Sequence, residues 1–294
     1  MIPAAAYVEL DINALRHNVG RVKELAPKSK IIAVIKANAY GHGLELVASN
    51  LAAQVDAFAV ARIDEALCLR AANIQGRILV LQGFSGPDEL LLMQHNQLET
   101  VIHSEQQVDL LETEKLPAGL PVWIKIDTGM NRLGFRPEQF SDVLQRLLQC
   151  RNVQAEINFM THFANADDLQ DDKTTRQLQL FNATTKGCGG LRSSANSAAI
   201  IAWPATHQDW VRPGLILYGA SPLLNQSARQ LELLVVMNFY SRIIVIKQVK
   251  KGEAVGYGGS WVATKDILLG VISIGYGDGY PRYAKPGTPV LINK

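Results

Sequence analysis

Lys36 has the setting that most directly suggests chemistry in this chain. It follows residues 31–35, a continuously apolar run rich in β-branched side chains, which is typical of a strand buried on both faces. Burial at the end of such a strand lowers the pKa of a lysine and makes its amine nucleophilic, as in lysines that form Schiff bases. The plainer alternative is a lysine whose ammonium group reaches water past an apolar stem.

Other polar candidates stand near the ends of later apolar runs. His162 follows residues 155–159, and a histidine there is either a satisfied structural group or a catalytic one. Arg132 lies in the segment 127–134, and its guanidinium stays charged and can hold a carboxylate in two places.

Asn196 and Ser197 stand where a helix is expected to begin. They can cap that helix or hold a phosphate at its N-terminus. The glycine-rich run 275–282 is a weaker candidate for a phosphate loop, because no helix is expected after it.

Strand and helix patterns alternate along the first two thirds of the chain, and they must position these residues. Apolar runs predict strands at residues 31–35, 57–60, 78–81, 100–102, 122–126, 155–159, 191–193 and 215–217. Amphipathic segments predict helices after Asp11 and at residues 64–72, 87–95, 105–111, 137–148 and 174–185. Eight strands with helices between them predict an α/β fold, a (β/α)₈ barrel of the TIM type. A doubly wound sheet is disfavoured, because no glycine-rich nucleotide turn follows the first strand.

The pattern changes after residue 222. Residues 223–231 are polar, and residues 235–246 and 267–274 predict strands separated by turns. We therefore expect a barrel over residues 1–222 and an all-β domain over residues 223–294, which the strand at residues 6–11 can also join. The chain ends where a strand is expected to begin pairing, so we expect this second domain to be truncated.

The run 33–43 (Ala-Val-Ile-Lys-Ala-Asn-Ala-Tyr-Gly-His-Gly) resembles the cofactor-lysine segment of alanine racemases. The segments 127–134, 253–261 and 275–282 resemble further motifs of that family in the same order, and the resemblance covers essentially the whole chain. It implies an isomerase with a barrel and a β-domain that uses pyridoxal 5'-phosphate (PLP) to interconvert L- and D-alanine. D-alanine formed in the cytoplasm would supply peptidoglycan of the cell wall.

The resemblance also implies roles for the residues of the reaction. Lys36 would carry PLP and exchange a proton on one face of the substrate, while Tyr257 would act on the other face from the partner of a homodimer. A phenol ordinarily ionises near pH ~10, so Tyr257 needs help from its surroundings. Arg132 would contact the substrate carboxylate, with Lys125 beside it as a carbamate. The plainer alternatives are a turn tyrosine between glycines and a strand lysine paired with an acid.

The remaining implied contacts are with the cofactor. Arg212 would face the pyridine nitrogen, and because an arginine cannot accept a proton, it disfavours transamination. The other implied cofactor contacts are Tyr40, His162, Asn196, Ser197, Gly214 and Leu215.

Composition narrows the class of protein further. The 294 residues carry a net charge of +2, from 29 basic and 27 acidic side chains, which argues against nucleic acid as a partner. No apolar run approaches the length of a membrane span, and the N-terminus lacks the pattern of a signal peptide. The three cysteines are widely spaced and show no metal-ligand pattern, so we expect reduced thiols, no metal and a cytoplasmic location.

Two alternatives of other kinds stay open at this point. One is a PLP-dependent decarboxylase, or a racemase of another amino acid, on the same scaffold, although Arg212 argues against the decarboxylases. The other is a truncated PLP-binding protein without catalytic activity.

Overall fold

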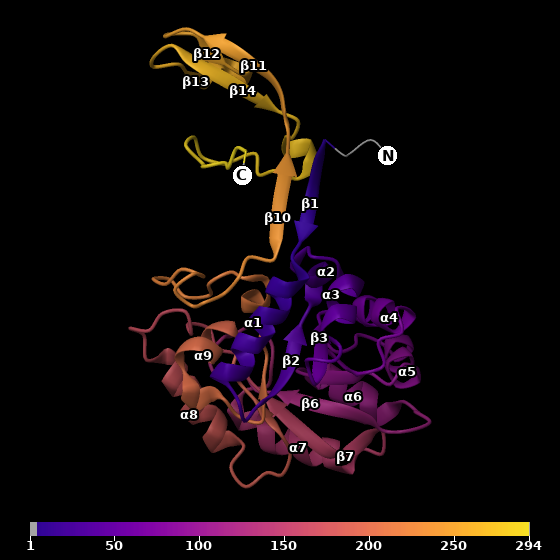
Figure 1. The fold of residues 1–294 in the computed structure, drawn as a ribbon. Coiled ribbons are helices and arrows are strands. Elements are labelled where there is room, and N and C mark those ends of the chain that lie inside the picture. The colour runs from indigo at the N-terminus through magenta and orange to yellow at the C-terminus, as the bar shows by residue number, and fades with distance from the viewer. Residues whose placement is uncertain (1–4, 294) are drawn as a thin grey trace. The chain divides into compact units, whose positions relative to one another are not determined.

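A computed structural model describes residues 5–293 of the chain (Figure 1). The chain divides into two compact units, one formed by residues 11–236 and the other by the N-terminal strand together with the residues from Met237 onward. Among the described residues, no helix combines the length and the apolar character needed to cross a membrane.

The larger unit is a closed barrel of eight parallel strands, as the sequence predicts. These strands are β2 (Lys30–Val34), β3 (Ala57–Val60), β4 (Arg77–Val80), β5 (Glu99–Ile102), β6 (Leu120–Lys125), β7 (Val153–Met160), β8 (Arg192–Ser193) and β9 (Trp210–Val211). The barrel closes where β9 pairs with β2.

Helices surround the strands of this unit (Figure 1). They are α1 (Ile12–Leu25), α2 (Lys36–Tyr40), α3 (Leu44–Leu51), α4 (Ile63–Ala71), α5 (Pro87–His95), α6 (Glu105–Thr113), α7 (Phe140–Gln149), α8 (Lys173–Thr184) and α9 (Ser197–Ala202). Short 3₁₀ turns are η1 (Pro137–Gln139), η2 (Pro204–Thr206) and η3 (Leu215–Tyr218). Asp11 caps α1, since its carboxylate accepts hydrogen bonds of 2.9 Å from the amides of Asn13 and Ala14.

The eighth strand was predicted at the wrong place. Residues 215–217 form η3, whereas the strand that closes the barrel is β9, before Pro213. The carbonyl of Pro213 still accepts a hydrogen bond from Val34, but proline has no amide to continue the ladder. Gly219 then ends η3 in the left-handed conformation.

Alternate residues of the barrel strands fill its interior. This inner cluster contains Ile32, Val34, Ala57, Ala59, Leu79, Val101, Trp123, Met160 and Trp210. At the amino ends of the strands, Trp123 and Trp210 meet edge to face with centroids 6.3 Å apart. There the buried carboxylate of Glu99 accepts hydrogen bonds from Trp123 and Arg77. Buried side chains fill the barrel interior at this end, and the opposite end is the one that carries the candidate residues.

The smaller unit is built from short antiparallel pairs. Strand β1 (Ala6–Leu10) pairs with β10 (Met237–Ser241), β11 (Ile243–Val249) with β14 (Ile267–Ile272), and β12 (Ala254–Val255) with β13 (Trp261–Val262). Short 3₁₀ turns are η4 (Tyr257–Gly259) and η5 (Tyr276–Asp278). The single strand expected at residues 235–246 is in fact two strands that break at Arg242 and pair with different partners.

Two further features differ from expectation. The segment 223–236 belongs to the barrel unit, since Leu223, Leu233 and Val236 are buried in its core. Residues 289–293 form no strand.

Candidate active site

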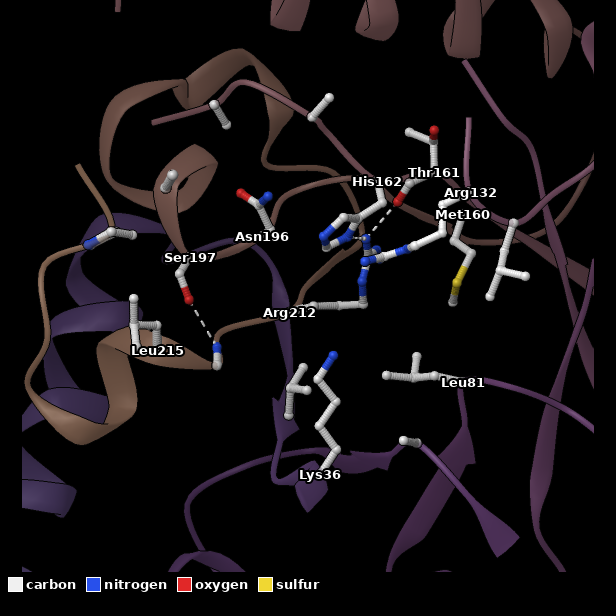
Figure 2. Close-up of a pocket in the computed structure, with 18 of the residues that line it drawn as sticks. Lys36, Leu81, Arg132, Met160, Thr161, His162, Asn196, Ser197, Arg212 and Leu215 are labelled. Carbon is white, nitrogen blue, oxygen red and sulfur yellow. Dashed lines mark hydrogen bonds between the residues drawn. The ribbon is translucent and has the colours of Figure 1, made fainter. Parts of the chain in front are cut away.

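A cavity of about 480 Å³ opens at the carboxyl ends of the barrel strands. Its walls come from the segments that follow these strands, the part of a TIM-type barrel that usually carries function (Figure 2). All ten candidate residues of the barrel unit line it: Lys36, Tyr40, Lys125, Arg132, His162, Asn196, Ser197, Arg212, Gly214 and Leu215.

Lys36 enters this cavity from the end of β2, and its amine points toward Arg212 (Figure 2). Burial lowers the pKa of Lys36, the positive charge of Arg132 lowers it further, and the carboxylate of Glu65 opposes both effects. The rest of α2, residues 37 to 40, is a left-handed turn and not a regular right-handed helix, with φ angles of 54°, 54°, 54° and 53°.

Arg212 lies on the opposite wall and is only 5 % exposed. Its guanidinium donates hydrogen bonds to Ser193 Oγ at 2.6 Å and to the carbonyls of Thr161 at 2.5 Å and Ser194 at 3.3 Å. All three acceptors are neutral, and burial lowers the pKa of Arg212 to about 10. Neutral partners hold this cation rigidly but leave its charge uncompensated.

His162 stands beside this guanidinium, its Nδ1 atom 3.4 Å from Nη2 of Arg212. Burial and the charges of Arg212 and Lys125 hold the pKa of His162 well below its usual value. The ring is therefore neutral near pH 7 and can accept a hydrogen bond from the arginine.

Lys125 and Arg132 are placed by β6 and by the loop that follows it. The carboxylate of Asp127 accepts hydrogen bonds from the amides of Gly129, Met130 and Asn131, at 2.9 to 3.0 Å, which shapes this loop. Burial, together with the charges of Arg212 and Arg132, lowers the pKa of Lys125 to about 8. An amine with that pKa is neutral in a large fraction of molecules at mildly alkaline pH.

The remaining wall joins α9 to η3. Asn196 caps α9 by accepting a hydrogen bond of 3.0 Å from the amide of Ala199. Ser197 Oγ accepts one of 2.9 Å from the amide of Gly214. A side chain at Gly214 would lie 2.6 Å from Tyr40 Oη, so glycine is needed for the tyrosine to pack there. Leu215, 38 % exposed, lies beside it.

These groups make the cavity strongly positive. Among its lining residues in the described chain, four cations (Lys36, Lys125, Arg132 and Arg212) face a single carboxylate, that of Asp167. Burial lowers the pKa values of Lys36, Lys125 and Arg212, and repulsion by neighbouring cations lowers those of Lys36 and Lys125 further, so a bound anion would stabilise these groups. A ligand with a phosphate, a carboxylate and an aldehyde for the amine fits this set, and PLP with an amino acid supplies all three.

Tyr257 belongs to the smaller unit. It begins the turn η4 between β12 and β13, and its side chain is 99 % exposed. Gly256 and Gly258, on either side, have positive φ angles that hold the tyrosine at the tip of the turn.

Several cavity residues could not be recognised from the sequence. Leu81, Met160 and Thr161 follow or end β4 and β7, so strand ends are the signal that points to them. Glu65 is not part of the cavity lining but reaches the backbone after Lys36, and its only signal in the sequence is that of an acid in the first turn of a helix.

Comparison with known proteins supplies the context for this geometry. The family model described as "Alanine racemase, N-terminal domain" matches residues 10–222, and "Alanine racemase, C-terminal domain" matches residues 236–294. An alanine racemase of Vibrio cholerae is 50 % identical over 293 residues, which are 100 % of this chain and 80 % of that protein. One of Photobacterium profundum is 50 % identical over 295 residues, covering 100 % of this chain and 81 % of that protein. The crystal structure of the biosynthetic alanine racemase of Pseudomonas aeruginosa superimposes with a TM-score of 0.94 at 40 % identity, over 98 % of this chain and 80 % of that one.

Proposed function

The chain belongs to the alanine racemase family, and we propose that it binds PLP in the barrel cavity and interconverts L- and D-alanine there. The observation that carries this proposal is the convergence of four cations, one of them an amine with a lowered pKa, on a cavity with a single carboxylate. Such a site favours an anionic cofactor that reacts with an amine.

When bound, PLP withdraws electrons from the Cα atom of the amino acid, so that its proton can leave. Lys36 would hold the aldehyde carbon of the cofactor. Ser197, Tyr40 and the amides near Gly214 and Leu215 would hold its phosphate, a role supported by the start of α9 and the hydrogen bond from Gly214 to Ser197. Arg212 would face the ring nitrogen, and its fixed proton favours proton exchange at Cα over transamination.

Racemisation requires a proton donor and acceptor on each face of the substrate. Lys36 is suited to one face, because its lowered pKa makes the neutral form that accepts a proton easier to reach than in an ordinary lysine. Tyr257 would serve the other face. Its high exposure within its own unit supports a role in contact with a second copy, so we propose a homodimer in which each chain donates Tyr257 to its partner.

Substrate binding falls to Arg132, with Lys125 behind it. The guanidinium of Arg132 can grip the carboxylate of alanine in two places. We propose that Lys125 carries CO₂ as a carbamate, because its pKa of about 8 provides the neutral amine that this reaction needs. The negative carbamate would then orient Arg132. The product D-alanine would supply peptidoglycan synthesis.

The proposal is tested by incubating the protein with PLP and L-alanine in deuterated water. We expect D-alanine by chiral chromatography and deuterium at Cα by NMR. Lys36→Ala should abolish both, whereas Lys30→Ala, at the other end of the same strand, should retain them. PLP bound without any D-alanine or exchange would contradict the assignment.

A further inference from the structure

The turn that follows Lys36 has a backbone that its sequence does not favour. Residues 37 to 40 all have left-handed φ angles, and glycine is absent from this run. Only Asn38 belongs to the residue types that adopt this conformation readily, while the two alanines and Tyr40 do not. Consecutive left-handed residues persist only where surrounding contacts enforce them.

Among the side-chain contacts that hold this left-handed turn, the one made by Glu65 lies nearest to Lys36. It lies in the first turn of α4 and is buried. Its Oε2 atom accepts hydrogen bonds from the amides of Ala61 at 2.9 Å and Arg62 at 3.2 Å, which is an ordinary way to cap a helix. Its Oε1 atom accepts a further hydrogen bond, of 2.5 Å, from the amide of Ala37. Capping α4 does not need this second oxygen, so its bond to the turn calls for another explanation.

Other contacts close the turn behind this anchor. Ala39 is fully buried, and its amide donates to the carbonyl of Ile35 at 2.8 Å. Asn38 Oδ1 accepts a hydrogen bond of 2.8 Å from the amide of Leu44, at the start of α3. The carbonyl of Ala37 accepts a hydrogen bond of 3.1 Å from the amide of Gly41, within the same turn. Glu65 is the side chain that holds the amide of Ala37, directly after Lys36.

We propose that Glu65 is the positioning residue of the active-site lysine: its carboxylate clamps the strained turn and so fixes where Lys36 and Tyr40 enter the cavity. Lys36 begins this turn and Tyr40 ends it. A turn of fixed shape holds the amine and the phenol at a constant separation, which suits a ligand that touches both. The cofactor part of this inference rests on the proposed function, whereas the clamp itself does not.

The charge of Glu65 has a second consequence. Burial and the positive charge of Arg132 disfavour the protonated form of Lys36, whereas the carboxylate of Glu65 favours it. Removing the carboxylate should therefore lower the pKa of Lys36 further.

The test uses the protein without PLP and requires no turnover. Lys36 is acetylated competitively across neutral to alkaline pH, and its labelling is followed by peptide mass spectrometry. In Glu65→Gln, we expect the midpoint of labelling to move down by about 0.5–1 pH unit. The matched control is Glu99→Gln, which removes another buried carboxylate, at the opposite end of the barrel. An equal midpoint in Glu65→Gln and the control would overturn the proposal.

Glu65→Asp keeps the charge but shortens the side chain, and it serves if Glu65→Gln does not fold. We expect this variant to keep the circular dichroism spectrum of the wild type while it captures PLP at least about tenfold more slowly, because the turn is no longer clamped. Capture at the wild-type rate would count against the clamp. If the labelling midpoint of Lys36 shifted in Glu65→Gln but the wild-type protein had no racemase activity, the proposed function would be refuted and the clamp would stand.

Discussion

The Nδ1 atom of His162 lies 3.4 Å from Nη2 of Arg212, and burial together with the charge of this guanidinium lowers the pKa of the ring and keeps it neutral. Because the folded-state pKa of His162 is depressed, the unfolded chain binds a proton below about pH 6.5 that the folded chain does not. The free energy of unfolding should therefore fall as the pH drops below about 6.5, by up to about 1.4 kcal/mol per pH unit. The fall stops once the pH reaches the folded-state pKa.

Urea unfolding at two pH values on either side of this midpoint measures the effect. His162→Asn, which keeps a hydrogen-bond acceptor without titrating, should flatten the pH dependence. The exposed His95→Asn is the matched control and should leave it as in the wild type. An unchanged slope in His162→Asn would show that other groups dominate.

A second prediction concerns Lys125, whose pKa is lowered to about 8. Its neutral amine should add to CO₂ and release a proton, which gives a carbamate in bicarbonate buffer at mildly alkaline pH. With ¹³C-labelled CO₂, a carbamate signal should appear by NMR, disappear in Lys125→Arg and persist in Lys36→Arg. The racemisation rate of Lys125→Ala should fall roughly 10- to 100-fold, because Arg132 loses its orienting partner. If the signal disappeared only in Lys36→Arg, the lysine that reacts with CO₂ would be Lys36, and the prediction for Lys125 would be wrong.

A third prediction tests the donation of Tyr257 across a dimer. Lys36→Ala and Tyr257→Phe chains should each be nearly inactive alone. After subunit exchange at equal amounts, a mixed dimer would hold one site with both Lys36 and Tyr257, so activity should recover to about one quarter by random pairing. No recovery would mean that both residues come from one chain.

A matched mixture checks that this recovery has the proposed cause. Lys36→Ala combined with Arg212→Ala should regain nothing, since both residues belong to one barrel and no mixed dimer contains an intact cavity.

The barrel could be predicted because its strands are apolar runs separated by helices with a clear repeat. The cavity could be anticipated as well, because residues after parallel strands meet at one end of a barrel. The eighth strand could not be predicted, because β9 contributes only two residues, too few for a pattern, whereas the apolar run of η3 imitates a strand. The two residues of β9 form a strand because they pair with the neighbouring strands β2 and β8.

The left-handed turn after Lys36 could not be predicted from the sequence either. The local preference of alanine argues against a left-handed conformation at Ala37 and Ala39. The contact of Ala37 with Glu65 is distant in sequence, and the hydrogen bond from Ala39 to Ile35 forms where Ala39 is buried, so neither can be recognised from local sequence. A sequence motif can therefore identify a reactive lysine without showing which contacts position its side chain.

The fourth prediction concerns the support behind the Arg212–Leu215 segment. Gly219 ends η3 with φ of +80°, and a Cβ atom there would lie 2.0 Å from the carbonyl oxygen of Leu234. That carbonyl also accepts a hydrogen bond of 2.8 Å from Asn18, so it cannot move freely. Gly219→Ala should lower the free energy of unfolding by roughly 3 kcal/mol or more.

Gly187→Ala is the matched control, since its φ of +79° is nearly the same but no atom lies within 4 Å of the new Cβ. It should lose only about 1–2 kcal/mol, the effect of the backbone angle alone. Urea unfolding of both variants measures the difference, and equal losses would show that Leu234 yields and that steric overlap at this turn is unimportant.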